Sequence, residues 1–296
     1  SMTSPLCNLC KSANVTFFDT HPNVKQDLWR CVECDFYFVH PHQPYVHSDR
    51  DEVEADAAPG YWANEEAIYY YQQWREKENE RLFELVIENV PLGCVLEIGT
   101  GDGPLTRRLA PRVKDYWGIE PDHNAIQRAR EFLDKPDGRL FQLRSDQLEE
   151  SPVFRGMVGK FDAVFLFSVL EHIKDPGSFF STSHKLLKGS GRLIISVPNS
   201  NHFLLFYKLR KLIGIEPWTY FHISFFNEHN LTKLLNNNGF DIIKIHQTSL
   251  IQDESINYFQ SRYRSTLLGL AMKMFRAIKL DRLFGMTTYF LVCKPN

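Results

Sequence analysis

Short apolar runs alternate with amphipathic stretches along the chain from residue 93 onward. The apolar runs occupy residues 94–98, 116–120, 140–143, 161–167, 192–197 and 286–293. The stretches between the first five runs carry apolar residues at helical spacing. Such alternation is typical of a parallel sheet with helices on both faces. We therefore predict an α/β fold whose ligands bind outside the carboxyl ends of the strands.

The chain before residue 91 has a different pattern. Residues 44–59 are polar and acidic, which indicates a linker or the rim of a preceding module. Asn64 can cap a helix that runs to about Asn89, because two glutamates follow it at the positive end of such a helix. We predict a module over residues 1–45, a linker and helix over 46–90, and a domain over 91–296 with inserts at about 200–221 and 250–283.

Composition narrows the class of protein. The chain has 296 residues, of which 43% are hydrophobic and 24% charged, and this balance is typical of a globular protein. The formal net charge is −2, so no global positive field favours nucleic acid as a partner. No run of 18 apolar residues and no signal-peptide order occurs. We therefore expect no transmembrane segment and a cytoplasmic location.

Four of the six cysteines form two pairs with metal-ligand spacing. Twenty residues separate the first pair, Cys7 and Cys10, from the second pair, Cys31 and Cys34. This is the zinc-ribbon pattern, in which four thiolates complete a closed tetrahedral site. A closed site has no open position for substrate, so we expect structural zinc that folds a module too small to bury a core.

Three alternatives to this zinc site remain open at this stage. The four cysteines can be free thiols in a small subdomain, or one pair can be a redox motif. A nearby histidine can also replace one cysteine as a ligand. The candidates for that replacement are His21, His40, His42 and His47.

A glycine-rich segment follows the first apolar run of the domain. It reads Glu97-Ile98-Gly99-Thr100-Gly101-Asp102-Gly103-Pro104. Glycines let the chain turn sharply and bring backbone N–H groups close to a ligand, and proline suits the first turn of the next helix. Glu120 ends the second apolar run, and an acidic side chain at that place can accept both ribose hydroxyls of an adenosine ligand.

At these residues the sequence resembles the class I S-adenosylmethionine (SAM)-dependent methyltransferases, whose first motif is Glu-x-Gly-x-Gly-x-Gly. The resemblance spans roughly residues 91–247 and continues at the fourth strand, at the end of the fifth, and from His222 through Phe240. The most similar branch includes ubiquinone-pathway O-methyltransferases and sugar or natural-product methyltransferases. Members with a cysteine-rich knuckle before the catalytic domain are similar in organisation.

This resemblance implies a Rossmann-like sheet of seven strands in the order 3-2-1-4-5-7-6, with the small zinc-binding module at its N-terminal side. It also implies SAM as the cofactor. Asp146 and Gln147 match the place where the family binds the adenine edge. The full set of residues expected to hold SAM is Glu97, Gly99, Gly101, Gly103, Glu120, Asp146 and Gln147.

Two histidines are the candidate catalytic residues. Methyl transfer needs the acceptor atom fixed in line with the methyl group, and an acceptor hydroxyl must also lose a proton. Histidine titrates near neutral pH, which makes His172 and His222 candidate general bases. Both can instead be structural histidines. We expect Glu171 to be a solvated carboxylate or one that acts through a neighbour, and alone it is a poor magnesium site.

The two inserts are candidates for acceptor selection. The segment 202–213 is aromatic and partly basic, and it can roof the acceptor pocket or pack on the ribbon. The segment 262–282 has six Lys or Arg and one acid. A basic amphipathic helix can lie on a membrane as a peripheral contact or bind phosphate groups. Alternatively, it buries its apolar face on the domain and keeps its charges solvated.

These observations predict a methyltransferase that transfers a methyl group from SAM to a hydroxyl or amine of a small polar acceptor. The acceptor classes considered are a sugar, a nucleotide-sugar or other phosphorylated compound, and a secondary metabolite. One alternative is an RNA methyltransferase whose zinc module contacts nucleic acid. Another is a non-catalytic SAM-binding scaffold. The sequence indicates no oligomeric state.

Overall fold

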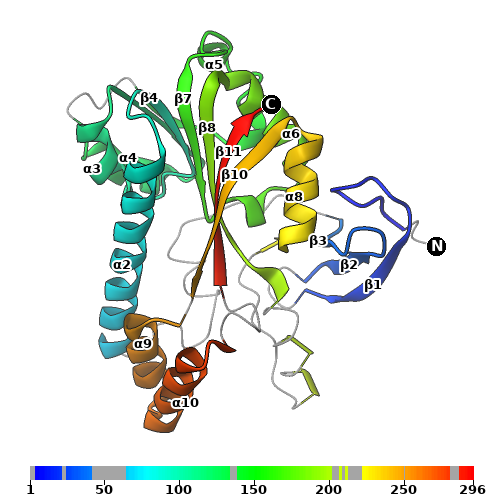
Figure 1. The fold of residues 1–296 in the computed structure, drawn as a ribbon, viewed down its shortest axis with the longest axis vertical. Coiled ribbons are helices and arrows are strands. Elements are labelled where there is room, and N and C mark those ends of the chain that lie inside the picture. Colours follow the sequence, from blue (N-terminus) through cyan, green and yellow to red (C-terminus); the bar gives the residue numbers. More distant parts are fainter. Residues whose placement is uncertain are drawn as a thin grey trace.

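A seven-stranded sheet forms the centre of the protein in the computed structural model (Figure 1). The structure describes residues 4–21, 25–41, 65–133, 139–201, 207–208, 211–212, 222–249, 251–280 and 287–296. The strands of this sheet are β4 (Cys94–Ile98), β5 (Asp115–Glu120), β6 (Leu140–Gln142), β7 (Phe161–Phe167), β8 (Leu187–Pro198), β10 (Phe240–Ser249) and β11 (Thr287–Pro295).

The strand order is β10-β11-β8-β7-β4-β5-β6, and β11 runs antiparallel to both of its neighbours. Renumbered along the domain, this is the predicted order 3-2-1-4-5-7-6, so the Rossmann-like fold class is confirmed. β4, β5, β7 and β8 are parallel, and their carboxyl ends therefore meet at one edge of the sheet. The glycine loop and the segment that contains His172 both begin at this edge.

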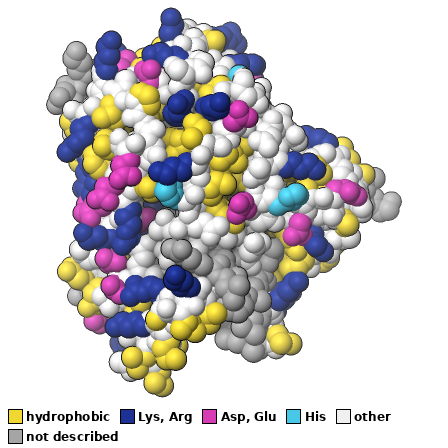
Figure 2. All heavy atoms as spheres, in the orientation of Figure 1, with side chains coloured by type: hydrophobic (Ala, Val, Ile, Leu, Met, Phe, Trp, Pro, Cys, Tyr) yellow, Lys and Arg dark blue, Asp and Glu magenta, His cyan; other side chains and the backbone are white. Residues whose placement is uncertain are grey.

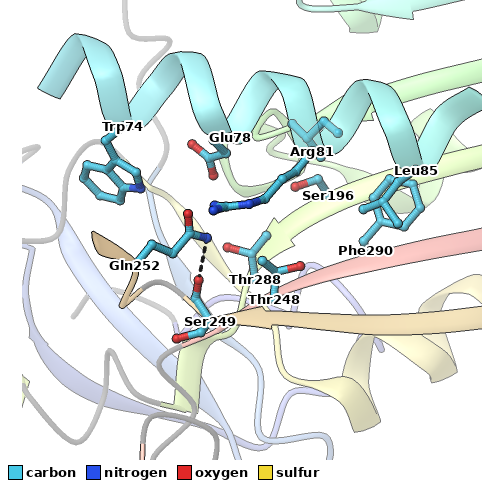
Figure 3. A pocket seen from close by; sticks show the side chains of 11 residues that line it. Trp74, Glu78, Arg81, Leu85, Ser196, Thr248, Ser249, Gln252, Thr288 and Phe290 are labelled. Atoms are coloured by element: carbon cyan, nitrogen blue, oxygen red, sulfur yellow. Dashed lines mark hydrogen bonds between the residues drawn. The ribbon is translucent and has the colours of Figure 1, made fainter. Parts of the chain in front are cut away.

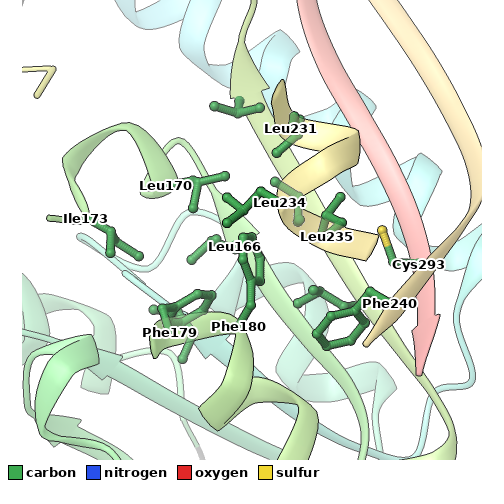
Figure 4. Close-up of a cluster of buried hydrophobic side chains, with 14 of the residues drawn as sticks. Leu166, Leu170, Ile173, Phe179, Phe180, Leu231, Leu234, Leu235, Phe240 and Cys293 are labelled. Atoms are coloured by element: carbon green, nitrogen blue, oxygen red, sulfur yellow. The ribbon is translucent and has the colours of Figure 1, made fainter. Parts of the chain in front are cut away.

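Helices cover both faces of the sheet. One face carries α2 (Glu65–Asn89), α3 (Thr106–Leu109) and α4 (His123–Arg130), and the other carries α5 (Pro152–Arg155), α6 (Pro176–Leu186) and α8 (Glu228–Asn237). Successive residues of β7 serve these two cores: Phe165 packs in the α2 core, whereas Leu166 packs in the α6 and α8 core. Figure 4 shows Leu166 among side chains from both of these last two helices. This alternation follows from the two-residue period of a strand.

The N-terminal module is joined to the domain by strand pairing. Its strands are β1 (Val15–Thr20), β2 (Asp27–Cys31) and β3 (Tyr37–Val39), and β9 (Ser224–Phe225) of the domain completes a four-stranded sheet. Tyr37 pairs with Phe225 and Phe38 with Ser224. The ring of Phe36 also lies 5.1 Å from the ring of Phe226, centroid to centroid. The module is therefore part of the domain's own hydrogen-bonded structure.

The described part of the first insert packs on the module. The Tyr207 hydroxyl donates a hydrogen bond of 2.6 Å to Asp19, and its ring lies 5.5 Å from the ring of Phe18. Of the two expected arrangements, these residues adopt the packing on the ribbon. Most of the predicted roof lies outside the described residues, as do the linker 44–59 and the predicted cap Asn64.

The second insert forms α9 (Asp253–Tyr263) and α10 (Thr266–Ala277), which pack on each other. The expectation that this insert buries its apolar face on the domain is wrong for α10. The exposed fractions are 77% for Leu267, 57% for Leu270, 69% for Met274 and 66% for Ile278. Figure 2 shows hydrophobic side chains together at the end of the molecule where α10 lies. Gly269, on the side toward α9, is the buried residue of this helix.

The described helices include none that combines the length and the apolar character needed to cross a membrane.

Candidate active site

The turn between β4 and α3 is built by three glycines with left-handed backbone. The φ angles are +74° at Gly99, +52° at Gly101 and +80° at Gly103, a region that favours glycine because it has no Cβ. A Cβ on Gly99 would lie 2.4 Å from a methyl carbon of Val169, and one on Gly103 would lie 2.9 Å from the Cα of Ala129. A Cβ on Gly101 would have no atom of the described residues within 4 Å. Gly101 therefore faces open space, whereas the packing around Gly99 and Gly103 leaves no room for a side chain.

Glu120 lies beside this loop. Its Oε2 accepts a hydrogen bond of 2.9 Å from the Gly101 N–H, and its Oε1 accepts one of 3.1 Å from the Asp122 N–H. These bonds fix the carboxylate at the end of β5. A carboxylate oxygen can accept more than one hydrogen bond, so Glu120 can also receive the paired hydroxyls of a ribose. The structure thus brings together the two features that the sequence proposed for adenosine binding.

Glu97 lies beneath the loop and is 3% exposed. Its carboxyl accepts a hydrogen bond from the Tyr116 hydroxyl, whose oxygen is 2.9 Å from Oγ1 of Thr106. Burial, together with the negative charge of Glu120, raises the pKa of Glu97 to about 8, although the hydrogen bond from Tyr116 opposes this shift. Any contribution of Glu97 to donor binding is therefore indirect, through support of the loop. The sequence pattern did not reveal Tyr116 as its partner.

Asp146 and Gln147 lie in a short 3₁₀ turn, Ser145–Gln147, after β6. Oε1 of Gln147 accepts a hydrogen bond of 2.9 Å from the Arg144 N–H, and the Arg144 guanidinium is 2.6 Å from the Asp146 carboxylate. Both side chains are exposed and hold their own turn in shape. Contact with an adenine edge stays a prediction for this pair.

A cluster of two histidines and a glutamate lies at the end of β7. His172 belongs to a 3₁₀ turn (Leu170–His172), and the centroid of its ring is 5.0 Å from that of His222. The two ring planes are 81° apart. Nε2 of His222 is 3.9 Å from Oε1 of Glu171. The structure therefore brings together the two candidate bases, although they are 50 positions apart in the chain.

Glu171 is buried, so the expectation that its carboxylate is solvated is wrong. The residue is 2% exposed, and its Oε2 has no hydrogen-bond partner among the described residues. Burial raises its pKa to about 8. Glu171, His172 and His222 offer ligand atoms that all lie within 4.8 Å of one another. The cluster can therefore accept a proton from an acceptor group, or hold a divalent cation.

The N-terminal module supports His222. A ring nitrogen of His21 lies 2.8 Å from the carbonyl oxygen of His222, and the next residue, Ile223, donates its N–H to the carbonyl of Glu171 at 2.9 Å. Burial lowers the pKa of His21 to about 4, so the ring is neutral. His21 was considered as a zinc ligand, but it lies in this contact instead. No spacing in the sequence indicated it.

The four predicted zinc ligands come together in the module. The Sγ atoms of Cys7 and Cys34 are 3.7 Å apart, and those of Cys10 and Cys31 are 3.5 Å apart. All four Sγ atoms lie within 4.8 Å of one another, and no disulfide forms between them. Tetrahedral zinc with bonds of about 2.3 Å places its sulfur ligands about 3.8 Å apart. The four thiols thus fit a zinc ion, which stays a proposal.

Ser168 is another residue that the sequence did not single out. It has a φ of +53° directly after β7, and its N–H donates a hydrogen bond of 3.0 Å to the Ser196 carbonyl of β8. A left-handed residue other than glycine is strained, and such strain is common at functional sites. This turn directs the chain from β7 into the segment with Glu171 and His172.

Known proteins resemble this chain in both sequence and structure. A family model described as "Methyltransferase domain" matches residues 71–245, which is more than half of the chain. The ubiquinone biosynthesis O-methyltransferase of Pseudomonas aeruginosa is 31% identical over 109 residues, or 36% of this chain and 45% of that protein. The mitochondrial enzyme of that name from Bos taurus is 29% identical over 156 residues, or 50% of this chain and 41% of that protein. The chain thus spans less than half the length of these relatives.

Solved structures agree on the fold. Magnesium protoporphyrin IX methyltransferase from Synechocystis PCC 6803, with bound SAH, has a TM-score of 0.51 and 17% identity, covering 77% of this chain and 86% of that chain. Mycolic acid cyclopropane synthase, also with SAH, has a TM-score of 0.51 and 14% identity, covering 72% and 83%. At these identities the likeness shows the fold alone. The family match carries the assignment: the chain belongs to the methyltransferase-domain family of class I SAM-dependent methyltransferases.

Proposed function

We propose that this protein transfers the methyl group of SAM to a hydroxyl or amine of a small polar acceptor, with a hydroxyl favoured. The observation that carries the proposal is that Gly101 and Glu120 form an open cradle at the same sheet edge as the paired rings of His172 and His222. The names of the O-methyltransferase relatives support a hydroxyl acceptor. They give no particular support to the sugar and nucleotide-sugar classes considered from the sequence.

The described residues leave open space beside Gly101, and the donor would occupy it. SAM, when bound, supplies an electrophilic methyl group on its sulfonium. Gly101 leaves space for the ligand because it has no side chain, and Glu120 would accept hydrogen bonds from the ribose hydroxyls. The turn with Asp146 and Gln147 would lie at the adenine end, beyond β5 in the sheet order.

The histidine cluster would move the proton of the acceptor. A ring nitrogen of His172 or His222 can take the hydroxyl proton as the oxygen attacks the methyl carbon. The resulting imidazolium would lie close to the Glu171 carboxyl. Its positive charge would favour the ionised form of that carboxyl, and the carboxylate would in turn stabilise the imidazolium. Glu171 would thus act through His222 and not on the acceptor itself. If a divalent cation occupies the cluster, the same three side chains would hold it beside the acceptor.

His172→Ala and His222→Ala are each expected to reduce kcat by roughly 10²- to 10⁴-fold, the usual contribution of a general base. The affinity for SAM should stay within about threefold of the wild type, since the rings lie at a different strand end from the glycine loop. The measurement is transfer of labelled methyl from SAM to a panel of phenols, alcohols and amines, with and without a chelator.

His184→Ala is the matched control, because His184 lies in the last turn of α6 beside Phe240, away from the carboxyl edge. It should leave kcat unchanged. SAM binding without turnover on any acceptor, and with no effect of His172→Ala, would instead favour a non-catalytic scaffold. Steeply salt-dependent binding of RNA would favour an RNA methyltransferase.

We also propose that α10 makes a peripheral contact with an anionic membrane surface. Leu267, Leu270, Met274 and Ile278 repeat at helical spacing, so they form one exposed stripe. Residues 264–280 contain no acidic residue, and Lys273 and Lys279 are exposed on the same segment. A helix with an apolar stripe and basic neighbours is typical of elements that lie in the plane of a lipid surface.

The double variant Leu270→Ser with Met274→Ser is expected to reduce sedimentation with vesicles of 30% phosphatidylglycerol by at least about fivefold. The reason is that it removes two of the four apolar side chains of the stripe. Val158→Ser is the control, since Val158 is 55% exposed in the turn after α5. Equal binding to vesicles without anionic lipid contradicts the proposal. The proposal is also contradicted if the wild type forms a concentration-dependent dimer that the double variant abolishes, because the stripe would then contact a second copy of the chain.

A further inference from the structure

A pocket between α2 and the sheet has largely apolar walls that also carry polar groups, and no step above uses them (Figure 3). The empty space within it and in the open solvent at its mouth together amounts to about 410 Å³. The side chains that line it come from α2, from the residue that caps α9 and from three neighbouring strands. They are Trp74, Glu78, Arg81, Leu82, Leu85, Ser196, Thr248, Ser249, Gln252, Thr288 and Phe290.

Two polar atoms in these walls are buried without a hydrogen-bond partner among the described residues: Nη1 of Arg81 and Oε1 of Gln252. The other guanidinium nitrogen of Arg81, Nη2, lies 4.0 Å from Glu254, and Nε2 of Gln252 donates to the Ser249 carbonyl at 2.9 Å. Figure 3 shows both side chains directed into the same space. A buried donor or acceptor without a partner is energetically costly, so these atoms favour a ligand that satisfies them.

The two atoms specify complementary chemistry. A guanidinium N–H needs an acceptor oxygen and binds an oxyanion most strongly, because the bond is then charge-assisted. The carbonyl oxygen of Gln252 needs a donor such as a hydroxyl. The hydroxyls of Thr248 and Thr288 lie on the same wall, and Trp74 offers an aromatic surface. Glu78 also lines the pocket, but it is paired with Arg75 at 2.5 Å and leaves Arg81 as the cation that faces the space.

The pocket and the histidine cluster both lie near the carboxyl edge of the sheet. Ser196 is two positions before the end of β8, and Thr288 is the second residue of β11, so both lie near the carboxyl edge of the sheet. β8 adjoins β7, whose end leads to His172, and neighbouring strands are about 4.8 Å apart. The charge of Glu78 also raises the pKa of Glu171, which is consistent with this proximity.

We propose that this pocket binds an oxyanion of the acceptor, a carboxylate or a phosphate, through Arg81, with a neighbouring hydroxyl bound by Gln252. The proposal rests on the proposed function, because it assigns the class of acceptor. It makes Arg81 a residue for acceptor specificity and not for the chemical step. The remaining part of the acceptor would extend from the pocket toward His172 and His222.

The test measures binding of three small probes without SAM: benzoate, phenyl phosphate and benzyl alcohol. Calorimetry or ligand-observed NMR is expected to show that at least one of the two anions binds tenfold or more tightly than the neutral alcohol. The stronger anion identifies a carboxylate or a phosphate as the group. Arg81→Gln should remove this preference, and Arg81→Lys should retain part of it, because the charge stays but the planar fork is lost.

Arg155→Gln is the matched control, since Arg155 is an exposed arginine in α5 on the other face of the sheet. It should leave the preference unchanged. Equal binding of all three probes overturns the proposal, and so does a preference that survives in Arg81→Gln. Because the assay involves no methyl transfer, anion binding with no turnover would refute the proposed function alone. Turnover that is indifferent to Arg81 would refute the pocket alone.

Discussion

Replacing Gly101 with alanine is expected to weaken binding of SAM and of S-adenosylhomocysteine by at least about 100-fold while the protein stays folded. The new methyl group would meet no atom within 4 Å in the part of the chain that the structure describes, so the fold there has room for it. It would project into the open space of the cradle, beside the N–H that Glu120 accepts. Calorimetric titration with S-adenosylhomocysteine, together with thermal unfolding, measures both effects.

Substitutions at two other glycines distinguish a loss of ligand contact from an effect of backbone strain. Gly159 has a φ of +66°, and a Cβ added to it would also lie more than 4 Å from every described atom, but it precedes β7 at the opposite edge of the sheet. Gly159→Ala should therefore cost a similar amount of left-handed strain, about 1–2 kcal/mol, and leave binding intact. Gly103→Ala should instead destabilise the fold, because its Cβ meets the backbone of Ala129. Wild-type affinity in Gly101→Ala would show that the donor does not lie on this loop.

Local pattern predicts those parts of the fold that depend on neighbours in the chain. The run 161–167 is the strand β7 because its residues alternate between two apolar cores. The glycine loop and Glu120 were also predictable, since a turn with left-handed residues needs glycine at fixed positions. The glycine loop and Glu120, which together form the candidate donor site, thus follow from the sequence.

The remaining features arise from contacts between distant segments. β9 has only two residues, and it is a strand because Tyr37 and Phe38 pair with it. Glu171 lies beside an exposed histidine, so only the packed structure reveals that it is buried. Arg81 and Gln252 are 171 positions apart, and no periodicity relates them. The amphipathic pattern of 262–282 predicts a helix with an apolar face, but it cannot say whether the domain covers that face.

We expect the four clustered thiols to hold zinc, and removing that ion should strongly reduce methyl transfer while SAM binding stays nearly unchanged. Cys31→Ser removes one of the four clustered thiols, and losing the proposed ion is expected to unfold the segments that these thiols hold together. The module supplies β3, which pairs with β9, and His21, which contacts the carbonyl of His222. Its loss should therefore displace His222, whereas Gly101 and Glu120 belong to the ends of β4 and β5 and should remain in place. We expect kcat to fall at least about 100-fold and the Kd of S-adenosylhomocysteine to change less than about threefold.

Hydrogen exchange provides the readout that separates this mechanism from general unfolding. In Cys31→Ser, and in the wild type after chelation, the amides of Tyr37–Val39 and Ser224–Phe225 should exchange fast, while those of β4 and β7 stay protected. Cys94→Ser is the matched control, because Cys94 lies in β4 outside the cluster, and it should retain about one zinc per chain. A zinc-free protein with full activity would contradict the coupling, because the strand pairing would then hold His222 without the metal. A parallel loss of donor binding would also contradict it, since the glycine loop would then depend on the module.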